Sequence, residues 1–190
     1  ISKEEKNMEP ILVPLSQGCE ELEAVTIIDL LRRADLEVIT AGLIAGPVKC
    51  SRGVVLIPDT NIDDICDNSF SMVVLPGGLQ GANHMDNDKR IHKIIQNVLK
   101  RGGFLGAICA APKVLANLGI LEGKTATSFP GVLDSTSFKN IKLSDEPVVR
   151  DGLIVTSQGP GTAIDFSLEL IGLLKGELKQ SIVEKGLMRP

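Results

Sequence analysis

The residue best placed for chemistry in this 190-residue chain is Cys109, within residues 104–112 (FLGAICAAP). An apolar run ends at this cysteine, and the small residues Ala107 and Ala111 lie two positions to either side. That pattern is typical of a strand-to-helix elbow, which exposes a nucleophile at the carboxyl end of a strand. A helix N-terminus beside the sulfur favours thiolate, so we predict a pKa below the ~8.5 of a free thiol. The alternative is a buried, inert cysteine.

Three other segments carry residues that would complete a thiol site. Glu20, Glu21 and Glu23 begin a predicted helix, a Pro-Gly-Gly sequence at 76–78 ends a buried strand, and a Gly-Pro-Gly turn lies at 159–161. Glycines let backbone N–H groups approach an oxyanion, and an acid moves a proton. Each signal is weak alone, because acids in a first helical turn are usually solvated partners of the helix dipole.

Alternating apolar runs and helical patterns predict the elements that position these residues. The strands are predicted over 11–15, 37–43, 54–57, 72–75, 104–108 and 153–156, and the helices over 20–33, 89–101, 111–118, 163–174 and about 175–187. We expect a disordered lead-in over 1–9, one domain over 10–190, and a surface loop with a short hairpin over 134–147. This alternation predicts an α/β fold whose parallel sheet is covered on both faces and binds ligands beyond the strands' carboxyl ends.

Composition restricts the partners and the compartment. The net charge is −4 and the chain has five Phe but no Trp or Tyr, which argues against nucleic-acid binding. No apolar run reaches the ~18 residues that would span a membrane. The four cysteines form no C-x-x-C pair, so we expect free thiols, no metal site and a cytoplasmic location. Because the sequence starts at Ile1, the alternative that an upstream targeting segment was removed stays open.

Six motifs, in this order, resemble those of the DJ-1/ThiJ/PfpI superfamily, in its DJ-1/YajL-like branch. They are GCEELEA at 18–24, DLLRRA at 29–34, CSRG at 50–53, VLPGG at 74–78, AICAAP at 107–112 and TSQGPGT at 156–162. The resemblance spans about residues 11–188. It implies a flavodoxin-like three-layer sandwich with a mostly parallel sheet and a nucleophile elbow, and usually a homodimer.

The resemblance also implies roles for individual residues. Cys109 would be the oxidisable nucleophile and Glu23 its protonated partner, with the amides of Gly77 and Gly78 beside the sulfur. Other positions would line the substrate pocket (Ala110, Phe129 and Pro160) or lie at a dimer or anion contact (Arg32, Arg52 and Cys50). Cys19, beside the acidic loop, would be oxidisable, whereas Cys66 would be a surface or core filler.

The implied function is a cofactor-independent, glyoxalase III-type or deglycase-like enzyme in carbonyl and oxidative stress. Its substrate would be a small aldehyde, methylglyoxal or glyoxal, or an adduct of one. The alternative is a redox sensor or redox-regulated chaperone that uses oxidation of Cys109. Phe129 stands where some members carry a histidine, which excludes a histidine-assisted proton shuttle.

The two histidines exclude related activities. No histidine follows Cys109 in the sequence, so a Cys-His-Glu amidotransferase triad is ruled out. PfpI-type peptidases carry a histidine directly after the nucleophile, where this chain has Ala110. We expect His92 on a solvated helix face, whereas for His84 the pocket and a surface loop both stay open.

Overall fold

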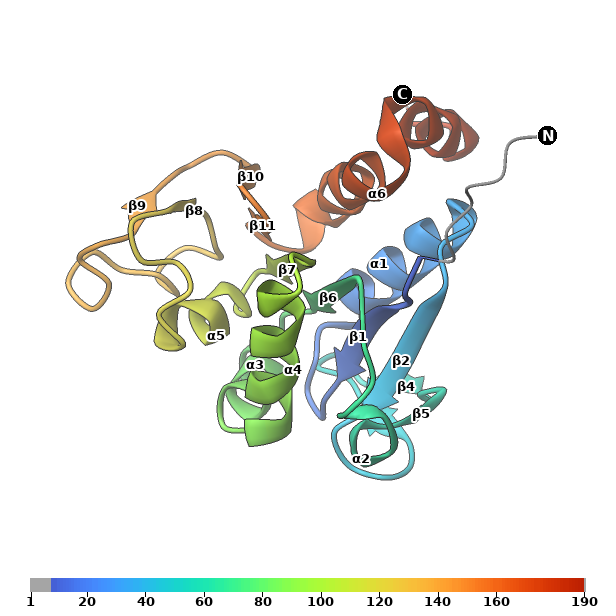
Figure 1. The fold of residues 1–190 in the computed structure, drawn as a ribbon, viewed down its shortest axis with the longest axis horizontal. Helices are drawn as coiled ribbons and strands as arrows, with labels where there is room; N and C mark the ends of the chain where they lie inside the picture. The colour runs from blue at the N-terminus through green and yellow to red at the C-terminus, as the bar shows by residue number, and fades with distance from the viewer. Residues whose placement is uncertain (1–7, 190) are drawn as a thin grey trace.

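The computed structural model describes residues 8–189 and has an α/β fold built on one large sheet (Figure 1). The sheet has seven strands in the order β10-β11-β7-β6-β1-β2-β5. Their bounds are Ile11–Leu15 (β1), Val38–Gly42 (β2), Thr60–Asn61 (β5), Met72–Leu75 (β6), Phe104–Ile108 (β7), Val148–Asp151 (β10) and Ile154–Ser157 (β11). All neighbours are parallel except β10 and β11. The predicted mostly parallel sheet is thus confirmed.

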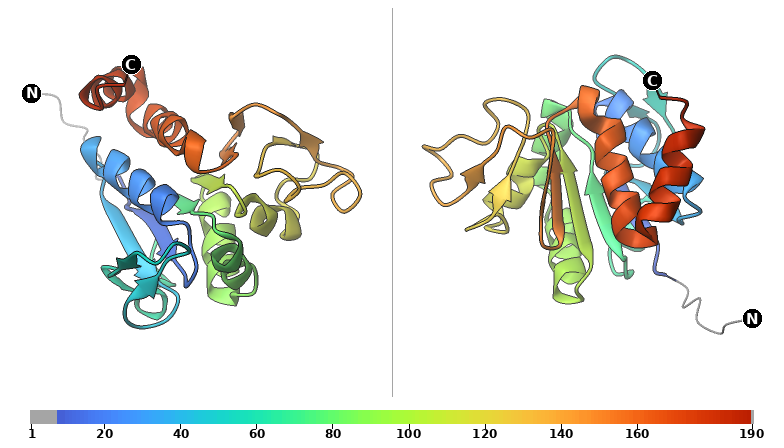
Figure 2. Two further views of the ribbon diagram at one scale, coloured as in Figure 1. Left: turned by 180° about the vertical axis from the view of Figure 1, so that it is seen from behind. Right: turned by 90° about the horizontal axis from the view of Figure 1, so that it is seen from above.

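Helices cover both faces of the sheet, so the protein has three layers (Figure 2). One face packs against α1 (Glu21–Arg33) and α6 (Ala163–Gly186), and the other against α2 (Ile62–Ile65), α3 (Leu79–Asp86), α4 (Lys89–Lys100) and α5 (Pro112–Asn117). Each face has its own cluster of buried apolar side chains. Burial of this surface is the main stabilising term for such a sandwich.

Local sequence explains where the helices begin and which face they bury. Asp88 caps α4 by accepting the N–H of Arg90 at 2.9 Å. The α4 residues Ile91, Ile94, Ile95 and Val98 are buried, and their spacing places them on one helical stripe. Within α6, Gly176 has φ 82° and ψ 167°, so the helix breaks near the predicted boundary between two helices.

Three local expectations need correction. The predicted strand over 54–57 contains β4 (Val55–Leu56), which pairs antiparallel with β3 (Val48–Lys49) outside the main sheet. Residues 134–147 hold β9 (Lys142–Leu143), which pairs parallel with β8 (Thr125–Ala126), so the hairpin predicted there is wrong. The stretch after Gly78 forms α3, where no helix was predicted. The pairings of β3 with β4 and of β8 with β9 involve strands of two residues each, which are too short to give a periodic signal in the sequence.

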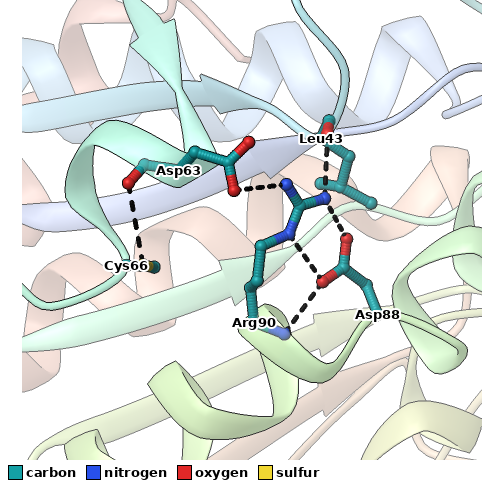
Figure 3. Close-up of polar contacts among 5 residues, drawn as sticks. All are labelled: Leu43, Asp63, Cys66, Asp88 and Arg90. Carbon is teal, nitrogen blue, oxygen red and sulfur yellow. Dashed lines mark hydrogen bonds and ion pairs between the residues drawn. The ribbon is translucent and has the colours of Figure 1, made fainter.

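Arg90 ties three segments together beside the sheet (Figure 3). Its guanidinium donates to the Asp63 carboxylate at 2.7 Å, to the Leu43 carbonyl at 2.9 Å and to Asp88. Charge-assisted hydrogen bonds of this kind hold α2 and the end of β2 against the start of α4. The thiol of Cys66 contacts the Asp63 carbonyl at 3.7 Å, so this half-buried residue belongs to the end of α2.

The ends of the chain are only partly described. Residues 1–7 of the expected lead-in lie outside the described residues, but the Glu9 carbonyl accepts the Ser71 hydroxyl at 2.6 Å and its carboxylate pairs with Arg101. None of the helices within 8–189 is long and apolar enough to cross a membrane.

Candidate active site

The site lies where four parallel strands end. The strands β1, β6, β7 and β11 run in the same direction, so the segments that follow them meet at one edge of the sheet. These segments lead into α1, into Gly77 and Gly78, into Cys109, and into the short 3-10 helix Pro160–Thr162. Ligands of open α/β sheets bind at this edge.

Cys109 sits in a strained turn directly after β7. Its φ is 63°, in the left-handed region that residues other than glycine seldom adopt. The Cys109 N–H donates to the Ser157 carbonyl at 2.9 Å, and its carbonyl accepts the Phe129 N–H at 2.9 Å. These bonds hold a turn that leaves Cys109 partly exposed, so a fully buried and inert thiol is excluded.

Glu23 lies beside the cysteine with its carboxyl group sealed from solvent. The residue is 0% exposed, and Oε2 accepts the Gly77 N–H at 2.8 Å. The other oxygen, Oε1, is buried and makes no hydrogen bond of ordinary geometry with the described residues. A Cβ added to Gly77 would lie 2.5 Å from Cys109 Cβ and 2.5 Å from Glu23 Oε2, so only glycine fits between acid and thiol.

The two acidic groups control each other's protons. Burial raises the pKa of Glu23 to about 7, against the lowering effect of the Gly77 N–H. Burial, and then the Glu23 carboxylate, raise the pKa of Cys109 to about 12. The predicted lowering of the thiol pKa is therefore wrong. The pair loses its protons in two steps, and between them one negative charge and one proton are shared.

Two backbone amides, from Gly78 and Ala110, approach the sulfur. Each lowers the pKa of the Cys109 thiol, although burial and Glu23 outweigh them. The elbow helix contributes less than expected because it starts at Pro112, which has no N–H to donate. The Gly77 amide is bonded to Glu23, so Ala110 takes the place beside the sulfur that we had expected Gly77 to fill.

A pocket of about 570 Å³ opens above the sulfur. Cys109 and Ala110 lie in its lining, together with Phe129 and Pro160. Phe129 is 48% exposed and gives the pocket an apolar wall. Arg52 also lines it, and within the described residues its guanidinium has no ion-pair partner. A largely apolar lining with a few polar groups is typical of a small-molecule site.

Three residues singled out in the sequence do not line this pocket. Arg32 donates to Asp59 at 3.0 Å and does not line the pocket. Cys50 is buried, and its sulfur lies 3.6 Å from that of Cys19; its place at a dimer contact stays a prediction. His84 lies on α3, donates from Nδ1 to the Gln17 carbonyl at 3.1 Å, and lines a different cavity.

His92 is half-buried rather than solvated, because its ring contacts the Asp86 carbonyl at 2.8 Å. Among residues 8–189, no three His, Cys, Asp or Glu side chains are grouped to hold a metal ion.

The sequence analysis missed the role of Glu21. This residue is buried and accepts the N–H groups of Arg52 at 2.9 Å and Val54 at 3.3 Å, and the Ser51 hydroxyl at 3.0 Å. Glu20 caps α1 and accepts the same Ser51 hydroxyl at 2.8 Å. The two acids therefore fix the pocket wall formed by the Ser51 loop, instead of facing solvent. In the sequence, only the CSRG motif at 50–53 indicated that this loop could belong to the site.

Comparisons with known proteins agree with this fold. The DJ-1/PfpI family model matches residues 9–173. The chain is 42% identical to protein dj-1beta of Drosophila melanogaster over 178 residues, 93% of this chain and 95% of that protein. The crystal structure of the fly protein superposes with a TM-score of 0.91 at 40% identity, covering 96% of this chain and 99% of that one.

Two further relatives bear on chemistry. One is named glutathione-independent glyoxalase DJR-1.2, from Caenorhabditis elegans, and is 34% identical over 177 residues, 93% of this chain and 94% of that protein. The other is the oxidized form of Toxoplasma gondii DJ-1, with a TM-score of 0.88 and 31% identity, covering 95% of this chain and 98% of that one.

Proposed function

Because this chain belongs to the DJ-1/PfpI family, we propose that it is a glyoxalase-type enzyme that needs no cofactor. Its substrates would be methylglyoxal, glyoxal or their adducts, and its role would be defence against carbonyl and oxidative stress. The nematode relative named as a glutathione-independent glyoxalase supports this chemistry.

The observation that carries the proposal is the placement of the buried Glu23 carboxyl group beside the Cys109 thiol at the floor of the pocket, with room for only a glycine between them. Between the two titration steps the pair holds one proton. When Glu23 keeps it, Cys109 is a thiolate with an acid beside it. A nucleophile paired with a proton carrier is what addition to an aldehyde requires.

The reaction follows from these positions. The Cys109 thiolate adds to the aldehyde carbon, a C–S bond forms, and the carbonyl oxygen becomes an alkoxide near the N–H groups of Gly78 and Ala110. Glu23 protonates this oxygen, takes the proton from the same carbon to give an enediol, and returns one to the neighbouring carbon. The proton on the first oxygen passes to the neighbouring oxygen, so that the first becomes the thioester carbonyl and the second a hydroxyl. The resulting thioester of a 2-hydroxy acid is hydrolysed by water, which restores the thiol. Only one water is consumed, and no external oxidant is needed.

Turnover by purified protein tests the proposal. We expect methylglyoxal to be converted to lactate without glutathione and in the presence of a chelator. Cys109→Ser should abolish this activity, whereas Cys66→Ser, at a half-buried thiol outside the pocket, should leave it unchanged. Full turnover by Cys109→Ser would show that the nucleophile is elsewhere.

A second candidate function, a redox sensor, uses the same sulfur. The pocket exposes Cys109 to peroxides, and the Gly78 and Ala110 amides are placed to bind sulfinate oxygens. The oxidized Toxoplasma relative favours this alternative. Selective oxidation of Cys109 in a protein that shows no aldehyde turnover would favour the sensor over the enzyme.

We also propose that the protein works as a homodimer. Apolar side chains are exposed on α1 and on the adjacent loop and hairpin, where Leu22 is 52%, Val25 46%, Val54 49% and Val55 57% exposed. The bonds from Glu21 to Arg52 and Val54 hold helix and hairpin together. A self-complementary apolar surface is the usual basis of a two-fold dimer.

A further inference from the structure

Two buried thiols, of Cys19 and Cys50, lie next to each other outside the catalytic pair. Their Sγ atoms are 3.6 Å apart, and the residues are 0% and 4% exposed. Cys19 lies in the turn between β1 and α1, and Cys50 directly follows β3. A disulfide has an S–S length near 2.05 Å, so closure needs a movement of only about 1.5 Å.

Backbone hydrogen bonds on both sides of the pair hold the two cysteines together. The Gly18 N–H donates to the Lys49 carbonyl at 2.8 Å, and the Ser51 N–H donates to the Cys19 carbonyl at 2.8 Å. These bonds join the segment before Cys19 to the one before Cys50, and Cys19 itself to the residue after Cys50. The thiols are therefore adjacent in the folded protein, and no loop-closure entropy remains to be lost.

We propose that Cys19 and Cys50 are a redox-modification site, which forms a reversible intramolecular disulfide by exchange with a small-molecule disulfide. The formation of this bond does not depend on the proposed glyoxalase activity. Cys19 precedes Glu20 and Cys50 precedes Ser51, and both following residues line the pocket. The disulfide therefore joins two walls of the pocket covalently.

The exchange proceeds in two steps that balance. The Cys50 thiolate attacks the small disulfide, forming a mixed disulfide and releasing one small thiolate. The Cys19 thiolate then attacks the Cys50 sulfur, forming the Cys19–Cys50 bond and releasing the second small thiolate. The two protein thiols lose two electrons and two protons, and the small disulfide is reduced to two thiols.

Cys50 is the entry point. It has the larger exposure of the two, and in the single chain its neighbours Ser51, Arg52 and Gly53 are exposed. Burial raises the pKa of both thiols, and a hydrogen bond from Cys19 favours the Cys50 thiolate. Exchange is therefore slow at neutral pH and accelerates as the pH rises.

The experiment uses the full chain carrying Cys66→Ser and Cys109→Ser, which leaves only the proposed pair. The protein is incubated with oxidised glutathione at pH 8.5, remaining thiols are alkylated after denaturation, and peptides are mapped by mass spectrometry without reduction. We expect one cross-linked peptide containing Cys19 and Cys50, and a melting temperature higher by roughly 5–10 °C than that of the reduced protein. Cys19→Ala in the same background should lose both signals.

Two outcomes would overturn the proposal. One is that both cysteines are recovered as free thiols after prolonged incubation; the other is a disulfide that joins Cys50 of two chains, seen on a non-reducing gel. The same peptide map is made on wild-type protein, so a failure of the double variant to fold does not leave the question open. A wild-type protein that shows no aldehyde turnover but still yields the cross-link would contradict the glyoxalase proposal and support this site.

Discussion

The Gly77 N–H donates a hydrogen bond to Oε2 of Glu23 at 2.8 Å, and this bond orients the carboxyl group. It leaves Oε1 as the buried oxygen without an ordinary partner. Cys109 is close enough for each group to change the pKa of the other. A protonated Oε1 can donate to the sulfur, so the unsatisfied oxygen has a function.

The first prediction concerns the pH dependence of Cys109 alkylation. In the wild type the Glu23 carboxylate, formed above about pH 7, helps to raise the thiol pKa to about 12, so the rate should rise only in alkaline solution. Glu23→Gln removes that acid, and only burial and the backbone amides then set the thiol pKa. Its midpoint should fall below pH 12, because the repelling carboxylate is gone.

Rates of iodoacetamide reaction between pH 5 and 10 measure this effect. At pH 9 we expect the variant to react on the order of tenfold faster, because more of its thiol is ionised. An identical profile for wild type and variant would remove Glu23 from control of the thiol.

The second prediction concerns stability. The folded-state pKa of Glu23 is raised to about 7, so its contribution to stability is fully present below the unfolded value of 4.5 and is lost as the pH rises through 7. That loss corresponds to roughly 3 kcal/mol. Glu23→Gln should match the wild type at pH 4.5 and be more stable at pH 8. Urea unfolding at both pH values tests it, and equal stabilities at pH 8 would contradict it.

The third prediction concerns the glycine between acid and thiol. Gly77→Ala should destabilise the protein by roughly 2–4 kcal/mol and abolish Cys109 reactivity, because the new Cβ overlaps both side chains. Gly161→Ala is the matched control, since a Cβ there meets nothing within 4 Å. Thermal unfolding and alkylation measure both effects. A reactive and stable Gly77→Ala protein would disprove the packing argument.

Much of this architecture could be predicted from the sequence because it depends on patterns of several residues. The runs that became β1, β6 and β7 are continuous and apolar, and the elbow around Cys109 has its own pattern. The positions of Glu20 and Glu21 in a first helical turn were equally clear. Their partners were not, because Ser51 and Arg52 come from a hairpin that no periodic signal places against α1.

The thiol pKa could not be predicted for a similar reason. The sequence indicated the helix and the elbow, both of which favour thiolate. It did not indicate the burial of the Cys109 thiol, which decides the direction of the shift ahead of the Glu23 carboxylate. The closeness of Cys19 and Cys50 could not be predicted either, since nothing in the sequence around either cysteine indicates that the two segments lie side by side.

The fourth prediction links oxidation to turnover. A sulfinate cannot attack a carbonyl, so peroxide treatment should reduce methylglyoxal turnover in proportion to the fraction of oxidised Cys109. Intact-mass measurement gives that fraction and lactate formation gives the activity. Lactate production that persists after complete conversion to sulfinate would place the nucleophile elsewhere.

The fifth prediction concerns assembly. Sedimentation should give about twice the 20.3 kDa mass of the chain. Val25→Asp puts a charge on the exposed face of α1 and should shift the protein to monomer. Leu178→Asp, on a residue that is 78% exposed on α6, is the control and should stay dimeric. A wild-type monomer at micromolar concentration would reject the dimer.

The bond from the Cys109 N–H to the Ser157 carbonyl has a consequence during synthesis. The turn that presents the sulfur is complete only after β11 has left the ribosome. At 5–20 residues per second, that is roughly 2–10 s after Cys109 itself has left it. In the interval the nascent chain carries an ordinary cysteine, without the shared proton and without the pocket. Selective reactivity therefore reports that translation has passed Ser157 and that the first and last parts of the chain have met.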